Sequence, residues 1–126
     1  TPGDVKTDLE QLLENPASTT QHKAEALFLI GENLASKSEY EKATAYFERV
    51  YVVYGKYRDL VAKSYFRRAE ILETKLNNKS AAYEVNAELG KREDLKDFRE
   101  ATLGRRKADE LKDFAPQQEE TEEAAL

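Results

Sequence analysis

The stretch that decides the fold runs from Ala24 to Gly55 and reads AEALFLIGENLASKSEYEKATAYFERVYVVYG. Its apolar residues recur at the three- and four-residue spacing of amphipathic helices, first around Leu27 and again around Phe47. Gly31 stands in the middle of the first apolar run, where glycine costs a helix roughly 1 kcal/mol relative to alanine. The missing side chain must therefore permit packing that contributes more than this cost.

Cap and breaker residues divide the chain into helical segments. Possible N-caps are Ser18, Ser38, Asp59 and Asn78, and the first two begin capping boxes with Gln21 and Glu41. Gly55 and Gly90 are placed as C-terminal stops, and Pro116 is a further breaker. These signals predict helices over about 4–14, 18–36, 38–54, 59–76, 78–90 and 94–114.

Small residues repeat along these segments with a regular spacing. Gly31 and Ala43 are 12 positions apart, as are Ala69 and Ala81, and the two pairs are offset by 38 positions. Gly104 follows Ala69 by 35 positions. Self-similarity at such a period is typical of helical solenoids. We expect close helix crossings at these positions, with Phe47 interlocking beside them, so that Gly31→Leu would cost at least about 1–3 kcal/mol.

The predicted fold is therefore all-α, a right-handed superhelix of antiparallel helix pairs. Its expected parts are an N-terminal half-repeat or capping helix (1–17), a helix pair (18–57), a second helix pair (58–91), a C-terminal capping helix (92–115) and a disordered acidic tail (116–126). The tail reads PQQEETEEAAL, a composition too polar to bury a core.

The segment from Ala24 to Tyr57 resembles the tetratricopeptide repeat, a helix–turn–helix unit. LFLIGENL matches the first helix of that family, and YEKATAYFERV matches the second. The second pair, 61–90, departs from the pattern because Val85 stands in place of an aromatic residue and Glu88 in place of an apolar one. The long offset is similar to that of tetratricopeptide proteins of bacterial cell envelopes, including outer-membrane assembly and Tol–Pal-associated factors.

The resemblance implies a function in binding a peptide or partner protein, because the first helices of successive repeats line a concave groove in this family. Carried over by helix face, the groove residues are Glu25, Phe28, Glu32, Lys63, Phe66, Glu70, Glu73, Phe98, Ala101 and Arg105. An apolar anchor ringed by carboxylates suits a peptide with large apolar side chains and some positive charge. The alternative is that Phe28 and Phe66 fill contacts between helices.

Composition narrows the classes of function. The net charge of −5 argues against nonspecific binding to polyanions. Because the chain has no cysteine, thiolate chemistry is excluded. No apolar run approaches the roughly 20 residues that span a bilayer. Basic clusters at 67–68, 91–92 and 105–107 leave a nucleic-acid role as a remote alternative, although no nucleic acid is expected. The tyrosines at 51, 54 and 57 either pack between repeats or form a surface that binds a partner.

The sequence offers few residues from which a catalytic site could form. His22 is the only histidine, and the chain has no glycine-rich phosphate loop and no HExxH spacing. We therefore expect a scaffold that is not an enzyme and carries no cofactor or metal. The alternative is a structural spacer within a longer solenoid, which would self-associate through its end helices. The opening TPGD and the lack of methionine indicate an excised or processed chain, and periplasm, cell envelope and cytoplasm all remain open.

Overall fold

The computed structural model describes residues 2–116, with side chains from Thr7 onward. Within this range the chain is helical and contains no strand. The elements are α1 (Pro2–Glu14), α2 (Thr20–Ser36), α3 (Tyr40–Val53), α4 (Arg58–Thr74), α5 (Lys79–Lys91), the 3-10 turn η1 (Glu93–Leu95), α6 (Arg99–Glu110) and the 3-10 turn η2 (Lys112–Phe114).

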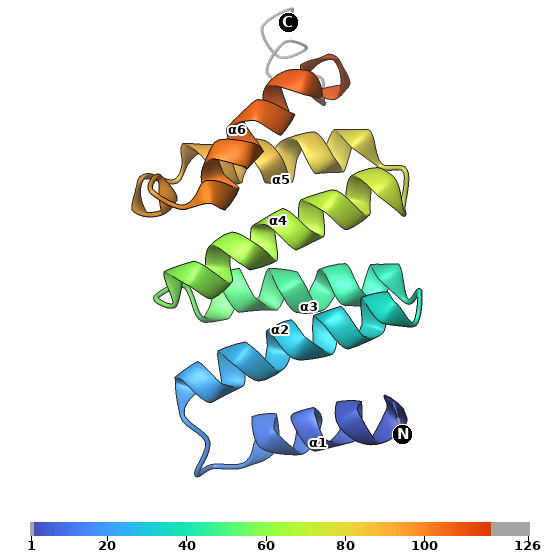
Figure 1. Ribbon diagram of the computed structural model, residues 1–126, viewed down its shortest axis with the longest axis vertical. Helices are drawn as coiled ribbons and strands as arrows, with labels where there is room; N and C mark the ends of the chain where they lie inside the picture. Colours follow the sequence, from blue (N-terminus) through green and yellow to red (C-terminus); the bar gives the residue numbers. More distant parts are fainter. Residues whose placement is uncertain (1, 117–126) are drawn as a thin grey trace, which may run out of the picture.

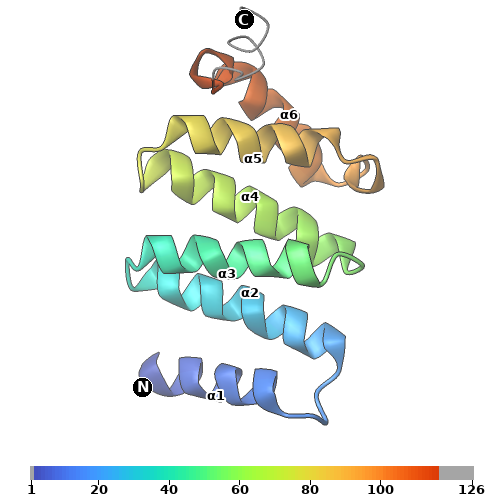
Figure 2. The ribbon, with the colours of Figure 1, turned by 180° about the vertical axis from the view of Figure 1, so that it is seen from behind.

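The six helices stack in chain order along the long axis of the molecule, with successive helices running in opposite directions (Figures 1 and 2). Each helix packs on the next one in the chain, and α4 also contacts α2 and α6. The helices α1, α3 and α5 lie nearly parallel, whereas α2, α4 and α6 are inclined to them (Figure 1). Thus α2, α4 and α6 meet along one side of the stack.

The core forms two buried clusters that follow this stacking. One lies around Ile30 and Phe47 in α2 and α3, and the other runs from Tyr51 in α3 to Leu111 after α6. Leu76, at the end of α4, packs against both. Because α4 contributes to both clusters, the helix pairs share one continuous apolar interior.

Gly31 is buried in α2, and its missing side chain makes room for an aromatic ring. A Cβ added there would lie 2.8 Å from Cε1 and 2.9 Å from Cζ of Phe47, closer than carbon atoms normally approach. Ala43 is fully buried on the same helix as Phe47. The predicted tight crossing between α2 and α3 is present, but its partner is the Phe47 ring.

Gly90 and Gly104 produce a closer approach between α5 and α6. A Cβ on Gly90 would lie 3.1 Å from both the backbone N and the Cα of Arg105. A Cβ on Gly104 would lie 2.9 Å from a Leu89 methyl group. Gly90 does not stop its helix as predicted, because α5 continues to Lys91 and the glycine is used for packing. The other predicted packing alanines are fully buried (Ala69) or half-buried (Ala81).

Several predicted caps were wrong by a residue or more. Thr19, not Ser18, caps α2, and its Oγ1 accepts a hydrogen bond from the His22 backbone N–H at 3.1 Å. Ser38 cannot cap α3 because it adopts φ 62° in the turn before it. Asp59 lies inside the first turn of α4, where its charge still favours the helix N-terminus. The Asn78 cap is confirmed, since Asn78 Oδ1 accepts a bond from the Ala81 N–H at 3.0 Å.

The predicted long helix over 94–114 was wrong, because the structure breaks it into η1, α6 and η2. Phe98 has extended backbone dihedrals (φ −83°, ψ 140°) and stands at the N-cap of α6. Leu95 is fully buried in η1, so the segment before α6 folds back onto the core. Gly55, which was predicted as the C-terminal stop of α3, lies two residues after the end of that helix at Val53. The predicted disordered tail falls, from residue 117 onward, outside the described residues.

Candidate binding groove

Two adjacent hollows lie on the side of the stack where α2, α4 and α6 meet. The first, between α2 and α4 with the start of α3, has a volume of about 540 Å³. The second lies between α4 and α6 over α5 and has a volume of about 310 Å³. Glu70 and Thr74 of α4 line both hollows. We call this pair of hollows the inner groove.

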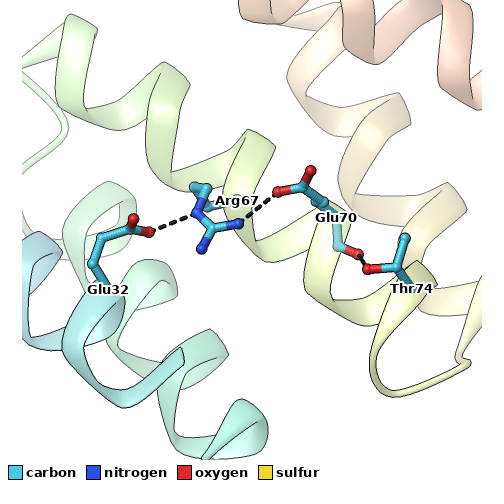
Figure 3. A network of polar contacts seen from close by, with 4 residues as sticks. All are labelled: Glu32, Arg67, Glu70 and Thr74. Carbon is cyan, nitrogen blue, oxygen red and sulfur yellow. Dashed lines mark hydrogen bonds and ion pairs between the residues drawn. The ribbon is translucent and has the colours of Figure 1, made fainter. Parts of the chain in front are cut away.

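Arg67 holds the first hollow together by joining α2 to α4 (Figure 3). Its Nε donates to Glu32 Oε1 at 2.6 Å and its Nη1 donates to Glu70 Oε1 at 2.5 Å. The guanidinium also lies 5.8 Å from the ring centroid of Phe47. Arginine suits this position because its planar fork presents several donors in fixed directions. Thr74 donates its hydroxyl to the Glu70 backbone carbonyl at 2.8 Å.

Lys107 plays the corresponding part in the second hollow by joining α4 to α6. Its ammonium lies 3.5 Å from Glu73 Oε1 and 3.1 Å from Glu110 Oε2. The hydrogen bond to Glu110 and the negative charge of Glu73 raise the pKa of Lys107 above its usual value. Each hollow therefore contains an ion-paired group of one cation between two glutamates. Lys75 also lines the first hollow and Arg106 the second, so that four carboxylates and four cations line the two hollows together.

The floor of the second hollow combines apolar walls with a buried amide. Phe66 of α4 and Leu103 of α6 supply apolar surface. Asn86 of α5 also lines this hollow, although its side chain is only 3% exposed. Its Nδ2 donates to the Ala82 carbonyl at 2.9 Å, which fixes the orientation of the amide.

Four of the ten predicted groove residues line the two hollows. Glu32, Phe66, Glu70 and Glu73 line the two hollows. Phe28 instead packs edge-to-face on Phe47, with ring centroids 5.4 Å apart, and belongs to the core. The predicted positions Glu25 and Lys63 are exposed on α2 and α4, Ala101 is buried in the core, and Phe98 packs against the core at the N-cap of α6.

Arg105 lies away from the second hollow. Its Nη1 donates to the Gly90 carbonyl at 3.2 Å, and it lines a separate shallow depression between α5 and α6. The reason is the close crossing at Gly90, which turns Arg105 toward α5. Arg106 and Lys107 face α4 instead. They lie one and two positions after Arg105, the residue that was predicted to line the groove.

Several residues that line the hollows were not identified as groove residues from the sequence, among them Arg67 and Asn86. Arg67 was assigned to a basic cluster, although a glutamate three positions later already indicates an ion pair on one helix face. Asn86 occupies an inward position between Val85 and Leu89, where a polar residue is unusual. This polar residue among the apolar positions of α5 was the sequence feature that could have identified Asn86.

Of the three clustered tyrosines, Tyr51 is buried, and Tyr54 and Tyr57 are half-buried. Tyr51 stacks on Tyr65, with centroids 3.7 Å apart and planes at 12°. Tyr65 donates its hydroxyl to Glu88 Oε1 at 2.6 Å, and Arg68 Nη1 donates to the Tyr51 oxygen at 3.0 Å. Burial raises the pKa of Tyr51 to about 12, and burial followed by the bond to Glu88 raises the pKa of Tyr65 further. Tyr51 thus packs between α3 and α4.

The basic clusters do not form one cationic surface. Arg67 pairs with glutamates in the inner groove, whereas Arg68 lies 3.7 Å from Glu48 of α3. Arg92 binds Asp94 at 2.7 Å and holds the pKa of that carboxyl below its usual range. Arg67, Arg68 and Arg92 thus meet acidic partners on different sides of the molecule, which weakens the case for nucleic-acid contacts.

Other site types are not apparent in residues 2–116. No three histidine, cysteine, aspartate or glutamate side chains of this range come together in a way that could hold a metal ion. None of the helices described is long and apolar enough to cross a membrane. Comparisons with family models, with curated proteins and with solved structures find no match to the chain.

Proposed function

We propose that this chain is a protein-interaction module that binds a peptide or an extended segment of a partner protein in the inner groove. The observation that carries the proposal is the pair of adjacent hollows between α2, α4 and α6, which share Glu70 and Thr74 as lining residues. Concave sites with an apolar floor and a few polar groups are typical of binding surfaces.

The arrangement supports a tetratricopeptide-like superhelix as the architecture. Successive antiparallel helices stack in order, and alternate helices contact one another on one side. Such repeats bind partners along the surface lined by their first helices. In this assignment α2, α4 and α6 are those first helices, and α1, α3 and α5 form the back of the array.

Four glutamates of the groove offer contacts to basic residues of a ligand that also carries an apolar residue, although four basic residues line the same hollows. Glu32, Glu70, Glu73 and Glu110 each use one carboxylate oxygen in the ion pairs described above. In the proposed complex, the second oxygen of each carboxylate contacts a lysine or arginine of the ligand. Phe66 and Leu103 supply the apolar contact between them.

A peptide-display screen against the whole chain tests this function. We expect enrichment of peptides with a large apolar residue next to lysine or arginine. Leu103→Ser should weaken binding of the enriched peptides at least about tenfold, which corresponds to about 1.4 kcal/mol. Val53→Ser is the matched control, because Val53 is 60% exposed on α3 and lines neither hollow.

Failure to enrich any peptide would contradict the proposal. So would enriched peptides that tolerate Leu103→Ser and lose affinity with Val53→Ser. Circular dichroism of both variants must match the original chain, so that a loss of binding is not a loss of folding.

A further inference from the structure

One edge of the stack, where three helices end, is rich in lysine and lies next to the acidic end of the sequence. It comprises the turns that follow α2, α4 and α6, residues 37–42, 75–80 and 112–115, and we call it the loop edge. We propose that the loop edge binds residues 119–123 of its own chain, which read EETEE. No ligand of the inner groove is required for this contact.

The loop edge has apolar surface between its lysines. The turns after α2 and α4 lie on the same side of the stack (Figures 1 and 2). A depression of about 630 Å³ is lined by Leu76, Lys79 and Phe114, and Phe114 is 46% exposed. A second one, of about 360 Å³, is lined by Tyr40 and by the same Leu76. A chain segment that lies along this edge therefore meets apolar and cationic groups in turn.

Two lysines of the loop edge are held over aromatic rings. Lys79 Nζ lies 4.9 Å from the ring centroid of Phe114, and Lys75 Nζ lies 5.8 Å from that of Tyr40. A ring face engages one side of an ammonium group that has three N–H donors, so each lysine can still bind a carboxylate. Neither lysine takes part in an ion pair within residues 7–116, and both are exposed.

The loop edge has an excess of positive charge, although the chain as a whole is acidic. It holds five lysines and three acidic residues, and the one ion pair among the described side chains of this edge joins Lys42 to Glu39 at 3.5 Å. Asp109 lies just outside the edge in the depression between α5 and α6, and counting it still leaves an excess of one positive charge. The charged residues of the edge are Lys37, Lys42, Lys75, Lys79, Lys112, Glu39, Glu41 and Asp113.

The acidic segment follows directly on the loop edge in the sequence. The described part of the chain ends at Pro116, two residues after Phe114, and residues 117–126 contain four glutamates and no basic residue. An extended chain covers about 3.4 Å per residue, so the seven residues from 117 to 123 reach up to about 24 Å. Neighbouring helices are about 8–10 Å apart, which brings Tyr40, two helices along from α5, within that reach.

The tether favours this segment over a separate acidic partner. Exposed ion pairs are individually weak, so a free acidic peptide would bind the loop edge poorly. A short linker holds an attached segment at an effective concentration on the order of millimolar, which lets weak pairs form. The loop edge is therefore best suited to an acidic segment of its own chain.

The absence of cysteine makes the test direct. Thr121→Cys introduces a single thiol in the middle of 119–123 and keeps all four glutamates. A nitroxide attached to this thiol broadens the NMR signals of nearby amides. In the dilute whole chain we expect strong signal loss for residues 75–80 and little for residues 54–58, because the 17 residues of α4 separate the two turns by about 25 Å. The loss should shrink in about 1 M NaCl, where the Debye length is about 3 Å.

Lys75→Gln combined with Lys79→Gln tests the two lysines. In the spin-labelled chain, these changes should reduce the broadening of residues 75–80 at least about twofold. Lys56→Gln is the matched control, because Lys56 Nζ also lies over a ring, 5.2 Å from the centroid of Tyr57, but on the turn between α3 and α4. It should leave the broadening unchanged. The amide spectra of both variants before labelling report whether the fold is kept, and the salt titration tests the contact without any change to the edge.

Broadening that is confined to residues next to Pro116, or that is unchanged by Lys75→Gln with Lys79→Gln, would overturn the inference. A mixture of spin-labelled chain with isotope-labelled chain that lacks the spin label reports contacts between copies. Signal loss at residues 75–80 that is as strong in this mixture as within one chain would overturn binding of the segment to its own chain. The display screen for the inner groove is unaffected by either result.

Discussion

The crossing of α2 with α3 and the crossing of α5 with α6 both depend on glycine, but the glycines meet different neighbours. Gly31 faces the ring of Phe47, a side chain that can tilt. Gly90 faces the backbone of Arg105, which can move only if the whole helix moves. The first crossing is thus set by side-chain fit, and the second by direct approach of two backbones. The same residue type therefore tolerates substitution to very different degrees.

The largest effect is expected from Gly90→Ala. The new Cβ would lie 2.5 Å from Arg105 Cγ and 3.1 Å from its backbone, so α5 and α6 must separate. Overpacking of this kind costs about 1–3 kcal/mol, against which alanine recovers under about 1 kcal/mol of helix propensity. We expect the free energy of unfolding in urea to fall by about 2 kcal/mol.

Gly55→Ala is the control for that measurement. A Cβ on Gly55 would meet only the Tyr51 carbonyl oxygen at 3.7 Å, and its φ is not positive. This substitution should leave stability unchanged or raise it by up to about 1 kcal/mol. Equal losses at positions 55 and 90 would remove the distinction between packing glycines and turn glycines.

The stacked tyrosines between the two crossings should make stability fall at high pH. The folded pKa of Tyr51 is raised to about 12, above the unfolded value of 10.0, so the native state holds its proton longer than the unfolded state does. This contribution is complete below pH 10 and is lost as pH rises toward 12, at up to about 1.4 kcal/mol per unit. Urea unfolding between pH 9 and 12, in steps of about one unit, follows the loss.

Tyr51→Phe keeps the stacking ring and removes one ionisable group, so its stability should fall less steeply over the same pH range. Tyr65 still contributes in this variant, because its pKa is raised as well. If the stability of the original chain and that of the variant fall in parallel with pH, Tyr51 ionises at its ordinary pKa in the folded protein.

The side-chain nature of the first crossing is tested by a double-mutant cycle. Gly31→Ala places a Cβ against three atoms of the Phe47 ring and should cost about 1 kcal/mol. In a Phe47→Leu background the same change should be neutral or stabilising, because the clash is gone and alanine favours the helix. Calorimetry on the four proteins gives the coupling energy. If Gly31→Ala is still destabilising in the Phe47→Leu background, the new Cβ clashes with a group other than the Phe47 ring.

The corresponding rescue should fail at the second crossing. Arg105→Ala removes Cγ but leaves the backbone N and Cα at 3.1 Å from the new Cβ. Gly90→Ala should therefore remain destabilising in that background, in contrast to the behaviour of position 31.

The difference between the crossings also explains what could be predicted from sequence. Helix periodicity gave α2 to α5 within a few residues, because apolar spacing is a local property. The break before α6 was missed because Leu95 is held by contacts with the core that no local pattern contains. The inner groove was predicted best on α4, where Phe66, Glu70 and Glu73 all line it. It was predicted worst on α6, since the register of that helix depends on the contact between Gly90 and Arg105.

The smallest effect concerns Ser64 of α4, which corresponds to Ala26 of α2 at the repeat offset of 38 positions. Both side chains are buried, but Ser64 Oγ has no hydrogen-bond partner within the described part of the chain. A buried hydroxyl in this state loses its bonds to water without replacement, which lowers the stability of the fold. Ser64→Ala makes the second helix pair match the first, and should raise the free energy of unfolding by up to about 1 kcal/mol. A loss of stability in urea would show that the hydroxyl is bonded in solution and that the two positions are not equivalent.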